Sequence, residues 1–393
     1  MSKLFQPFRR AVAATILRGP VLNWWCNRKV LRLEQICLHE AVNVSSSPKI
    51  PAAKTQPARI PAPLLKKVVF ISDIMWEADG LIPDLEKICP VEVLNLRPVL
   101  RGVGEWNQKE AVLKAVQNFV RAGRDLEPDL VFLYLRGGLL SDETISMVRK
   151  AWPCPLVGMN LDDRVTFWNY NLFSSGDENY KAYAARFDLN LTNSLIASEW
   201  YRQYNLPFHY VAQGVYHPVG MVEPHLSSFR YPLSFLGSMK LDRAAIINQL
   251  QTYELQVETF GGGWPNAKWV DNPNDIYRSS QINLGIGSAT INLATIKGRD
   301  FECPGVGGCY LTSYNWELAS WWEIGKEILC YRNIEEAVEI ISYYRRRPEE
   351  CLRIGQAAFR RAAREHTWER RFRKLFTEQL GFKLPQGTHS THC

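Results

Sequence analysis

The sequence predicts an α/β protein built from two Rossmann-like domains. Short apolar segments rich in Val, Ile, Leu and Phe alternate with longer amphipathic segments, and this alternation is typical of β–α units around a buried parallel sheet. A loop rich in Pro, His and Ser interrupts the alternation between Gln213 and Arg230. The chain of 393 residues is long for one core and has room for two domains.

The first β–α series starts at Lys67, where the apolar run Val-Val-Phe-Ile ends in the polar turn Ser72-Asp73. Its expected strands are Lys67–Asp73, Val91–Leu96, Leu130–Tyr134, Leu156–Met159, Leu189–Thr192 and Tyr210–Gln213. Its expected helices are Ile82–Ile88, Gln108–Arg121, Asp142–Ala151 and Leu195–Tyr204. Ligands of such sheets bind outside the carboxyl ends of the strands. The informative positions are therefore Ser72-Asp73, Arg136–Gly138 and Asn160–Arg164.

The second series follows the interrupting loop. Its expected strands are Leu233–Ser238 with its turn, Leu255–Phe260, Gln281–Ile286, a segment from Cys309 and Glu327–Tyr331. Its expected helices are Asp242–Tyr253, Asn274–Ser279, Trp316–Trp322, Ile334–Arg346, Pro348–Glu365 and Trp368–Leu380. The last helix is basic, and it is free to return across the first domain.

The positive charge of the chain is concentrated at its amino end. Residues 1–67 hold twelve Lys and Arg against two Glu, which gives +10; the net charge of the whole chain is +7, so the remainder carries −3. The body of the protein therefore lacks the charge of a nucleic-acid-binding surface. Residues 45–63 are rich in Pro, Ser and Ala and read as a linker.

The first forty residues leave three alternatives open. They mix apolar side chains and the pair Trp24-Trp25 with arginines, and no acidic residue precedes Glu34. One alternative is an amphipathic segment that lies on an anionic membrane surface. The others are a basic tail without fixed structure and an organelle transit peptide. No apolar run is long enough to predict a membrane-spanning helix.

The sequence lacks the motifs of a zinc site and of several classes of enzyme. The nine cysteines form no CxxC pair and have no His or Cys partners at zinc spacing, so we expect free and mostly buried thiols in a reducing cytoplasm. The chain has no Gly-Lys-Ser/Thr phosphate loop and no Gly-x-Ser-x-Gly elbow. Their absence argues against a P-loop nucleotidase and a serine hydrolase.

The segment Asn160–Arg164 is the best candidate site in the first domain. Asp162 and Asp163 directly follow an apolar strand. The two carboxylates are able to hold a hydroxylated acceptor, and one of them to act as a base. The alternative is that one aspartate caps the next helix, because Asp is a preferred N-cap residue.

A second candidate is the segment Ala294–Leu311, ATIKGRDFECPGVGGCYL. It places Lys297 and Arg299 between two apolar segments that read as strands, just before a short helix. A helix N-terminus with neighbouring cations is suited to an anion. Glu302 beside these cations suits sugar hydroxyls. The alternative is a structural crossover with a surface Arg–Glu pair.

The second domain resembles the CgeB-like (spore maturation protein) glycosyltransferase family, whose members are related to retaining group 1 glycosyltransferases. The resemblance rests on the order of motifs over residues 230–380 and is looser over 67–230. The motifs are Phe235–Ser238 followed by Asp242-Arg243, Gly261–Trp264, Ser279–Gly285, Lys297–Glu302, Gly307-Gly308, Glu327–Tyr331 with Ile334–Ala337, and His366–Arg370. The resemblance implies the GT-B fold, in which two Rossmann-like domains face each other and a C-terminal helix crosses back. It implies a glycosyltransferase of the hexosyltransferase type that needs no metal.

The resemblance also assigns roles. Gly237 would allow the backbone to approach a diphosphate, and Arg243, Arg299 and Lys297 would neutralise it. Glu302 would bind the ribose hydroxyls of the nucleotide. Asp162 and Asp163 fall where related enzymes keep a polar pair that reaches the transferred sugar or the acceptor, and they are the catalytic candidates.

One position departs from the family pattern. Many retaining relatives carry an acid eight residues before the position of Glu302, and this chain has Ala294 there. Two alternatives to a transferase therefore stay open. One is a GT-B protein without turnover that serves in binding or surface assembly, and the other is a sugar-nucleotide epimerase.

These observations define the expected organisation of the chain. We expect a basic extension and linker over residues 1–65, an acceptor domain over 66–217, a donor domain over 218–366, and a returning helix with a tail over 367–393. The expected partners are a UDP- or GDP-type nucleotide sugar and a glycan, lipid-linked or protein acceptor, without nucleic acid, cofactor or metal. We expect a cytoplasmic location, with membrane contact through residues 1–40 as an open alternative.

Overall fold

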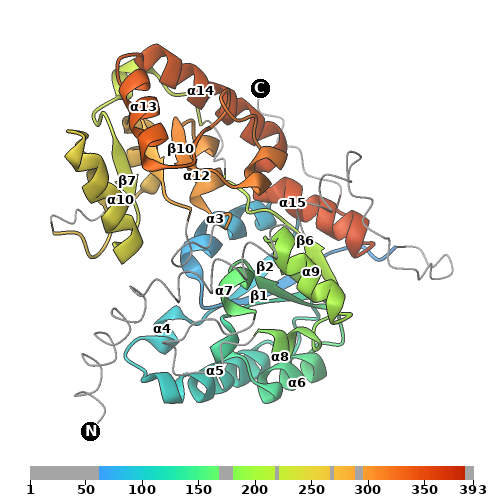
Figure 1. The fold of residues 1–393 in the computed structure, drawn as a ribbon. Helices are drawn as coiled ribbons and strands as arrows, with labels where there is room; N and C mark the ends of the chain where they lie inside the picture. Colours follow the sequence, from blue (N-terminus) through green and yellow to red (C-terminus); the bar gives the residue numbers. More distant parts are fainter. Residues whose placement is uncertain (1–61, 168–179, 217–220, 266–269, 288–294, 386–393) are drawn as a thin grey trace, which may run out of the picture. The chain divides into compact units, whose positions relative to one another are not determined.

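A computed structural model describes residues 62–167, 180–216, 221–265, 270–287 and 295–385. These residues fall within one compact unit that begins at Pro61. They form two parallel sheets with helices packed on both faces of each (Figure 1). The N-terminal extension, its Trp pair and Ala294 lie outside the described residues.

The first sheet has six strands, all parallel, in the order β2-β1-β3-β4-β5-β6. Its strands are β1 (Val68–Ser72), β2 (Val91–Asn95), β3 (Leu130–Tyr134), β4 (Leu156–Asn160), β5 (Leu189–Thr192) and β6 (Phe208–Tyr210). Strands β1, β3 and β4 are buried along their whole length, as expected for a sheet covered on both faces. We expected the last strand at Tyr210–Gln213, but β6 ends at Tyr210, because the chain from Val211 onward leaves the sheet for the second domain.

The helices of this domain are α3 (Met75–Glu86), α4 (Arg97–Leu100), α5 (Gln108–Ala122), α6 (Asp142–Ala151), α7 (Asp163–Thr166), α8 (Lys181–Ala184) and α9 (Leu195–Gln203). Serine caps fix the start of two of them: Ser141 accepts from the Thr144 N–H at α6, and Ser194 accepts from the Ala197 N–H at α9. In Figure 1, α5 and α6 lie on the face of the sheet opposite α3.

The second sheet has five parallel strands in the order β11-β10-β9-β7-β8. Its strands are β7 (Ser234–Leu236), β8 (Glu258–Phe260), β9 (Asn283–Gly285), β10 (Tyr310–Ser313) and β11 (Leu329–Tyr331). Its helices are α10 (Leu241–Thr252), α11 (Pro273–Ser279), α12 (Arg299–Gly305), α13 (Ile334–Tyr344) and α14 (Pro348–Arg361), with a short helical turn at Trp316–Ser320. One core cluster contains side chains of α10 and α13, and another contains side chains of α11 and α12.

The chain passes between the two domains at two neighbouring points. The Val215 N–H donates to the His366 carbonyl at 2.9 Å, and the Trp368 N–H donates to the Val215 carbonyl at 3.3 Å. After the second passage, α15 (Trp368–Lys374) and the turn Leu375–Gln379 pack on the first sheet. The Phe372 ring lies 5.8 Å from the Phe132 ring of β3. The C-terminal helix thus crosses back, as expected.

Each sheet changes the direction of its strand order between its first strand and its third strand. The changes lie between β1 and β3 and between β7 and β9. Open α/β sheets bind ligands at the carboxyl ends of the strands that flank such a point. Within the described residues, every helix is too short or too polar to cross a membrane.

Candidate functional site

Two glycine turns meet at the carboxyl edge of the second sheet. Gly237 follows β7, and its carbonyl accepts from the Trp264 indole N–H at 2.8 Å. Gly261 follows β8 with φ +104°, and a Cβ on it would lie 2.8 Å from the Gly237 carbonyl oxygen. Both positions therefore require glycine. Their close approach exposes backbone at the point where the strand order changes.

Two arginines lie over the ring of Phe235, which is the middle residue of β7. The guanidinium carbons of Arg243 and Arg299 are 5.7 and 5.1 Å from the ring centroid. Arg243 comes from α10 and donates to the Ser238 carbonyl at 2.8 Å. Arg299 comes from α12, and its Nη2 would lie 2.6 Å from a Cβ on Gly237. Residues from three segments thus converge beside the first glycine turn.

These arginines have buried donors without acceptors. Arg243 Nε and Arg299 Nη1 are buried and have no hydrogen-bond partner in the described part of the protein. Burial, together with the charge of Arg299, lowers the pKa of Arg243 to about 10. Buried donors are normally satisfied, and two unsatisfied cations side by side repel each other. An anion at this position would satisfy both and remove the repulsion.

The loop before α12 brings further charged groups. Asp300 is buried and accepts from the Lys297 N–H at 2.7 Å and from the Tyr310 hydroxyl at 2.7 Å. It therefore fixes the loop that carries Lys297 and Arg299. Helix α12 has seven residues, so we attribute the positive charge here to the side chains and not to a helix dipole, in contrast to our expectation for this segment.

Glu302 lies on α12 close to Arg299. Its Oε1 would lie 2.7 Å from a Cβ on Gly298, so a side chain at that position would displace the end of the Glu302 side chain. Burial raises the pKa of Glu302, while the charge of Arg299 opposes this rise. A hydrogen bond from the Tyr277 hydroxyl also favours the ionised form. The carboxylate thus lies near Arg299, one of the two unsatisfied arginines.

The two aspartates after β4 have different surroundings. Asp162 is 59% exposed, and its Oδ1 pairs with Lys297 Nζ at 2.7 Å. Asp163 is fully buried and accepts from Asn160 Nδ2 at 2.6 Å and from the Tyr201 hydroxyl at 3.1 Å. Burial raises the pKa of Asp163 well above its usual range. The pairing brings Asp162 to the loop of Lys297, whereas Asp163 lies inside the first domain; its catalytic role stays a prediction that this burial does not favour.

Other contacts between the two domains come from residues that carried no sequence signal. Glu317 is buried; its Oε2 accepts from the Leu195 N–H at 3.2 Å, and Tyr210 lies at 3.5 Å. Burial raises the pKa of Glu317 to about 7. Asn193 donates to the Ile296 carbonyl at 3.3 Å. Single Glu and Asn residues in loops have no pattern from which such contacts could be predicted.

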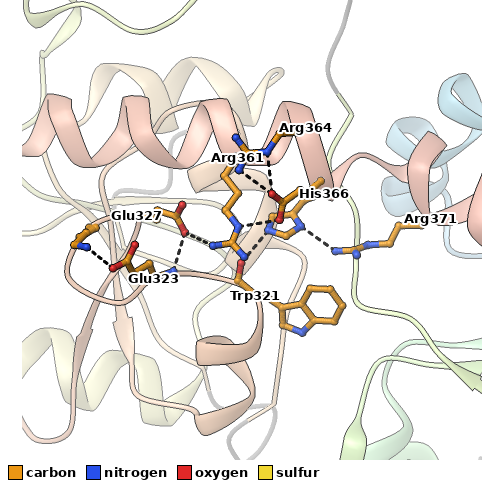
Figure 2. A network of polar contacts seen from close by, with 9 residues as sticks. Trp321, Glu323, Glu327, Arg361, Arg364, His366 and Arg371 are labelled. Carbon is orange, nitrogen blue, oxygen red and sulfur yellow. Dashed lines mark hydrogen bonds and ion pairs between the residues drawn. The ribbon is translucent and has the colours of Figure 1, made fainter. Parts of the chain in front are cut away.

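A polar network surrounds the second passage of the chain between the domains (Figure 2). His366 Nε2 faces the Trp321 carbonyl at 2.9 Å, and its Nδ1 faces Arg371 Nη2 at 3.4 Å. Burial and the charge of Arg371 lower the pKa of His366 to about 4. A neutral ring with its proton on Nε2 would donate to the Trp321 carbonyl and accept from Arg371 at Nδ1. The Arg371 guanidinium lies 4.4 Å from the Trp321 ring centroid. Arg361 pairs with Glu327 and Glu365 in the same network.

The residues expected to bind a donor differ in how closely the structure brings them together. Gly237, Arg243 and Arg299 form one contiguous group, and Glu302 adjoins Arg299. Lys297 lies on the same loop and is paired with Asp162. The group stands at the strand-order change of the second sheet, which is where a ligand is expected.

Comparisons with known proteins agree with this arrangement. Residues 243–377 match a family model described as glycosyl transferase-like. Sucrose-phosphate synthase from Thermosynechococcus elongatus is 11% identical with a TM-score of 0.56, and the match covers 79% of this chain and 99% of that chain. HepE from Anabaena, solved in complex with UDP and glucose, is 14% identical with a TM-score of 0.53, and the match covers 79% and 98%.

A glycosyltransferase from Rickettsia africae is 10% identical with a TM-score of 0.51, and the match covers 80% of this chain and 98% of that chain. At these identities the similarity shows the fold, and the chain has the GT-B fold of two Rossmann-like domains. A comparison with curated protein sequences finds no match.

Proposed function

We propose that the protein is a glycosyltransferase that moves a sugar from a nucleoside diphosphate donor, of the UDP or GDP type, to an acceptor hydroxyl. The observation that carries the proposal is the pair of buried, unsatisfied arginines beside the Gly237 turn. A diphosphate is a ligand of the right charge, because its oxygens accept the paired hydrogen bonds that planar guanidinium groups donate. The glycosyl transferase-like match over residues 243–377 covers the same arginines.

The proposed reaction exchanges one bond of the anomeric carbon for another. The bond between the anomeric carbon and the diphosphate oxygen breaks, the acceptor oxygen forms the new bond to that carbon, and the acceptor proton is released. Negative charge develops on the departing diphosphate, and Arg243 and Arg299 lie where they would stabilise it. With these cations fixed in advance, the proposal requires no metal ion for departure. Activity that is retained in EDTA would support this part of the proposal.

Glu302 is proposed to hold the nucleotide at its ribose. A carboxylate accepts hydrogen bonds from two vicinal hydroxyls, and the charge of Arg299 opposes the rise in the pKa of Glu302 that burial causes. Asp162 is proposed to act at the sugar or acceptor side, since it is exposed and paired with Lys297. We retain the CgeB-like subfamily and a hexosyl donor as the finer parts of the proposal.

Donor binding can be tested by calorimetry with UDP and GDP on the wild type, Arg299→Ala and Arg243→Ala. Each substitution removes charge-assisted hydrogen bonds, so we expect affinity to fall by about ten- to a hundredfold. Arg332→Ala is the matched control, because Arg332 is an exposed arginine of the same domain paired with Glu336. If neither nucleotide binds the wild type, or if Arg332→Ala weakens binding equally, the proposal is wrong.

Ala294 favours a second candidate, a GT-B protein that binds a nucleotide sugar without transferring it. The two candidates predict the same nucleotide binding and differ in turnover. Release of UDP or GDP from the sugar nucleotide, lost in Glu302→Ala, would decide for the transferase. Binding without any release or transfer would decide for the second candidate.

Residues 1–40 are proposed to contact an anionic membrane surface. The proposal rests on their basic and apolar composition alone. Co-sedimentation with anionic vesicles should occur for the full chain and be lost for a chain that starts at Leu65. Vesicle binding that persists in the shorter chain would contradict it.

A further inference from the structure

A charged pair lies at the strand-order change of the first sheet, the counterpart of the donor position in the second sheet. Asp73 follows β1 and Arg136 follows β3. Arg136 Nε donates to Asp73 Oδ2 at 2.6 Å, and the Arg136 N–H donates to Asp73 Oδ1 at 3.2 Å. The Asp73 side chain is 3% exposed, whereas that of Arg136 is 49% exposed. A buried carboxylate therefore holds an exposed guanidinium in one orientation.

The hydrogen bonds to Asp73 leave one edge of the Arg136 guanidinium accessible to a ligand. Asp73 engages Nε and the backbone of Arg136, and the two Nη groups make no hydrogen bond to any described residue. Two parallel N–H groups on a fixed plane match the oxygens of a carboxylate or a phosphate. A guanidinium with restricted motion also loses less entropy when it binds.

The same edge of the sheet presents an aromatic platform. The segment from Arg97 to Asn107 connects β2 to α5, and Trp106 within it is 85% exposed. Helix α5 contacts both this segment and the turn Gly137–Leu139 that follows Arg136. Strands β2 and β3 are two positions apart in the sheet, which is about 10 Å. Trp106 and Arg136 thus lie in segments that follow β2 and β3, and α5 contacts the segment of Trp106 and the turn after Arg136.

The other charged residues of the segment from Arg97 to Asn107 also favour the binding of an anion. Arg97 and Arg101 are exposed, and Glu105 is the single acidic residue between Leu96 and Asn107. Several contacts between the two domains come from residues at or just after the ends of β4, β5 and β6, namely Asp162, Asn193, Leu195 and Tyr210. The ends of β2, β1 and β3 carry the arginines and Trp106 instead.

We propose that this edge is the acceptor subsite and that it selects a glycan bearing a carboxylate or a phosphate. Arg136, oriented by Asp73, binds the anionic group, and Trp106 packs on the apolar face of a neighbouring sugar ring. The inference rests on the proposed function, because it names the acceptor class of that reaction.

The test uses the full chain with UDP present and three oligomeric probes of similar length, two of which are oligosaccharides. A hyaluronan octasaccharide carries carboxylates, a glycerol phosphate oligomer carries phosphates, and chito-octaose is neutral. We expect calorimetry to show that at least one anionic probe binds ten times more tightly than chito-octaose. Arg136→Ala should reduce this affinity by about ten- to a hundredfold. UDP affinity should not change, which separates a failure of this inference from a failure of the donor site.

Arg149→Ala is the matched control. Arg149 also pairs with an aspartate, Asp188, but this pair lies beside Leu156, at the start of β4 and thus at the opposite edge of the sheet. Equal losses in Arg136→Ala and Arg149→Ala would indicate general attraction of charge and overturn the inference. Equal binding of neutral and anionic probes, or no binding of any probe, would overturn it as well.

Trp106 is tested separately by Trp106→Ala and Trp106→Phe. The first should weaken the anionic probe about tenfold, within the range of aromatic contacts, and the second should restore most of the affinity because it keeps an aromatic face. Binding to anionic vesicles tests the alternative that the surface around Trp106 contacts lipid. If Trp106→Ala abolishes vesicle binding and leaves glycan binding unchanged, the surface is a lipid contact and the inference is wrong.

Discussion

Asp163 in the first domain and the pair of Arg243 and Arg299 in the second domain differ in how their buried polar groups are satisfied. In the first domain, Asp163 is buried and its oxygens accept hydrogen bonds from Asn160 and Tyr201. In the second domain, Arg243 and Arg299 are brought together with buried donors that no described residue satisfies. The first arrangement stabilises the protein by itself, and the second is complete only with a ligand. For these residues, the satisfaction of buried polar groups therefore distinguishes a structural aspartate from a candidate binding pair.

The largest effect that tests this contrast is expected at Asp163. Asp163→Ala leaves the Tyr201 hydroxyl buried without this acceptor and removes one of the two acceptors of Asn160 Nδ2, so the free energy of unfolding should fall by about 3 kcal/mol. The adjacent Asp162→Ala is the control, because Asp162 is exposed. Urea denaturation of both variants measures the difference. A loss of activity in Asp163→Ala with unchanged stability would instead support the catalytic role.

The next effect is a pH dependence at Glu317. Its pKa in the folded protein, about 7, is above the usual 4.5, so the folded state binds the proton more tightly. Protonated Glu317 therefore contributes to the stability of the fold. This contribution is complete below pH 4.5 and is lost as the pH rises to 7, which lowers the free energy of unfolding by up to about 3 kcal/mol. Glu317→Gln should remove this fall, as measured by denaturation at several pH values.

His366 acts in the opposite direction in nearly the same window. Its pKa is lowered to about 4 from the usual 6.5, so its stabilising contribution is present above pH 6.5 and is lost as the pH falls to 4. The stability of Glu317→Gln should therefore rise more steeply with pH than that of the wild type. Parallel curves for the two proteins would show that Glu317 does not titrate as described.

A smaller effect is expected at the glycine turns. Gly261→Ala would place its Cβ 2.8 Å from the Gly237 carbonyl oxygen, at a φ of +104°. We expect a loss of about 1–2 kcal/mol in stability, with weaker UDP binding because the Gly237 turn moves. Gly262→Ala is the control, since a Cβ there meets nothing within 4 Å. Thermal unfolding with and without UDP distinguishes the two.

The smallest change in stability should follow Asp162→Asn. Its partner Lys297 is exposed only in part, but Asp162 itself is open to solvent, so the pair should contribute less than about 1 kcal/mol. The substitution frees Lys297, and UDP affinity should rise a few-fold. Kinetics test the catalytic prediction: a hundredfold lower kcat with unchanged stability would support Asp162 as a catalytic residue.

Much of the fold could be predicted from the sequence because buried parallel strands leave continuous apolar runs. Leu130–Tyr134 was predicted to the residue. β6 was placed two residues late, since the apolar pattern continues from the sheet into Val211 and Ala212, which are buried at the passage between domains.

The site could be predicted only in part. Arg243, Arg299 and Glu302 were recognised from the order of motifs, and the structure brings the two arginines together over Phe235. The different surroundings of Asp162 and Asp163 were not predictable, because the direction of a side chain after a strand depends on the next turn of the backbone. Asp300 was also missed, since its role is a contact with its own loop and with Tyr310.

The returning helix has a consequence for synthesis of the protein. Trp368, Phe372 and Phe376 belong to the same core as Val68, Phe70 and Phe132, although about 300 residues separate them along the chain. A ribosome delivers the first sheet long before these rings, so one face of that sheet stays uncovered while the second domain is made and folds. Synthesis of the first domain therefore starts before that of the second domain, but its folding is complete only after the C-terminal helix has been made. We therefore expect nascent chains that stop before Trp368 to bind chaperones and to resist proteases only over the second domain.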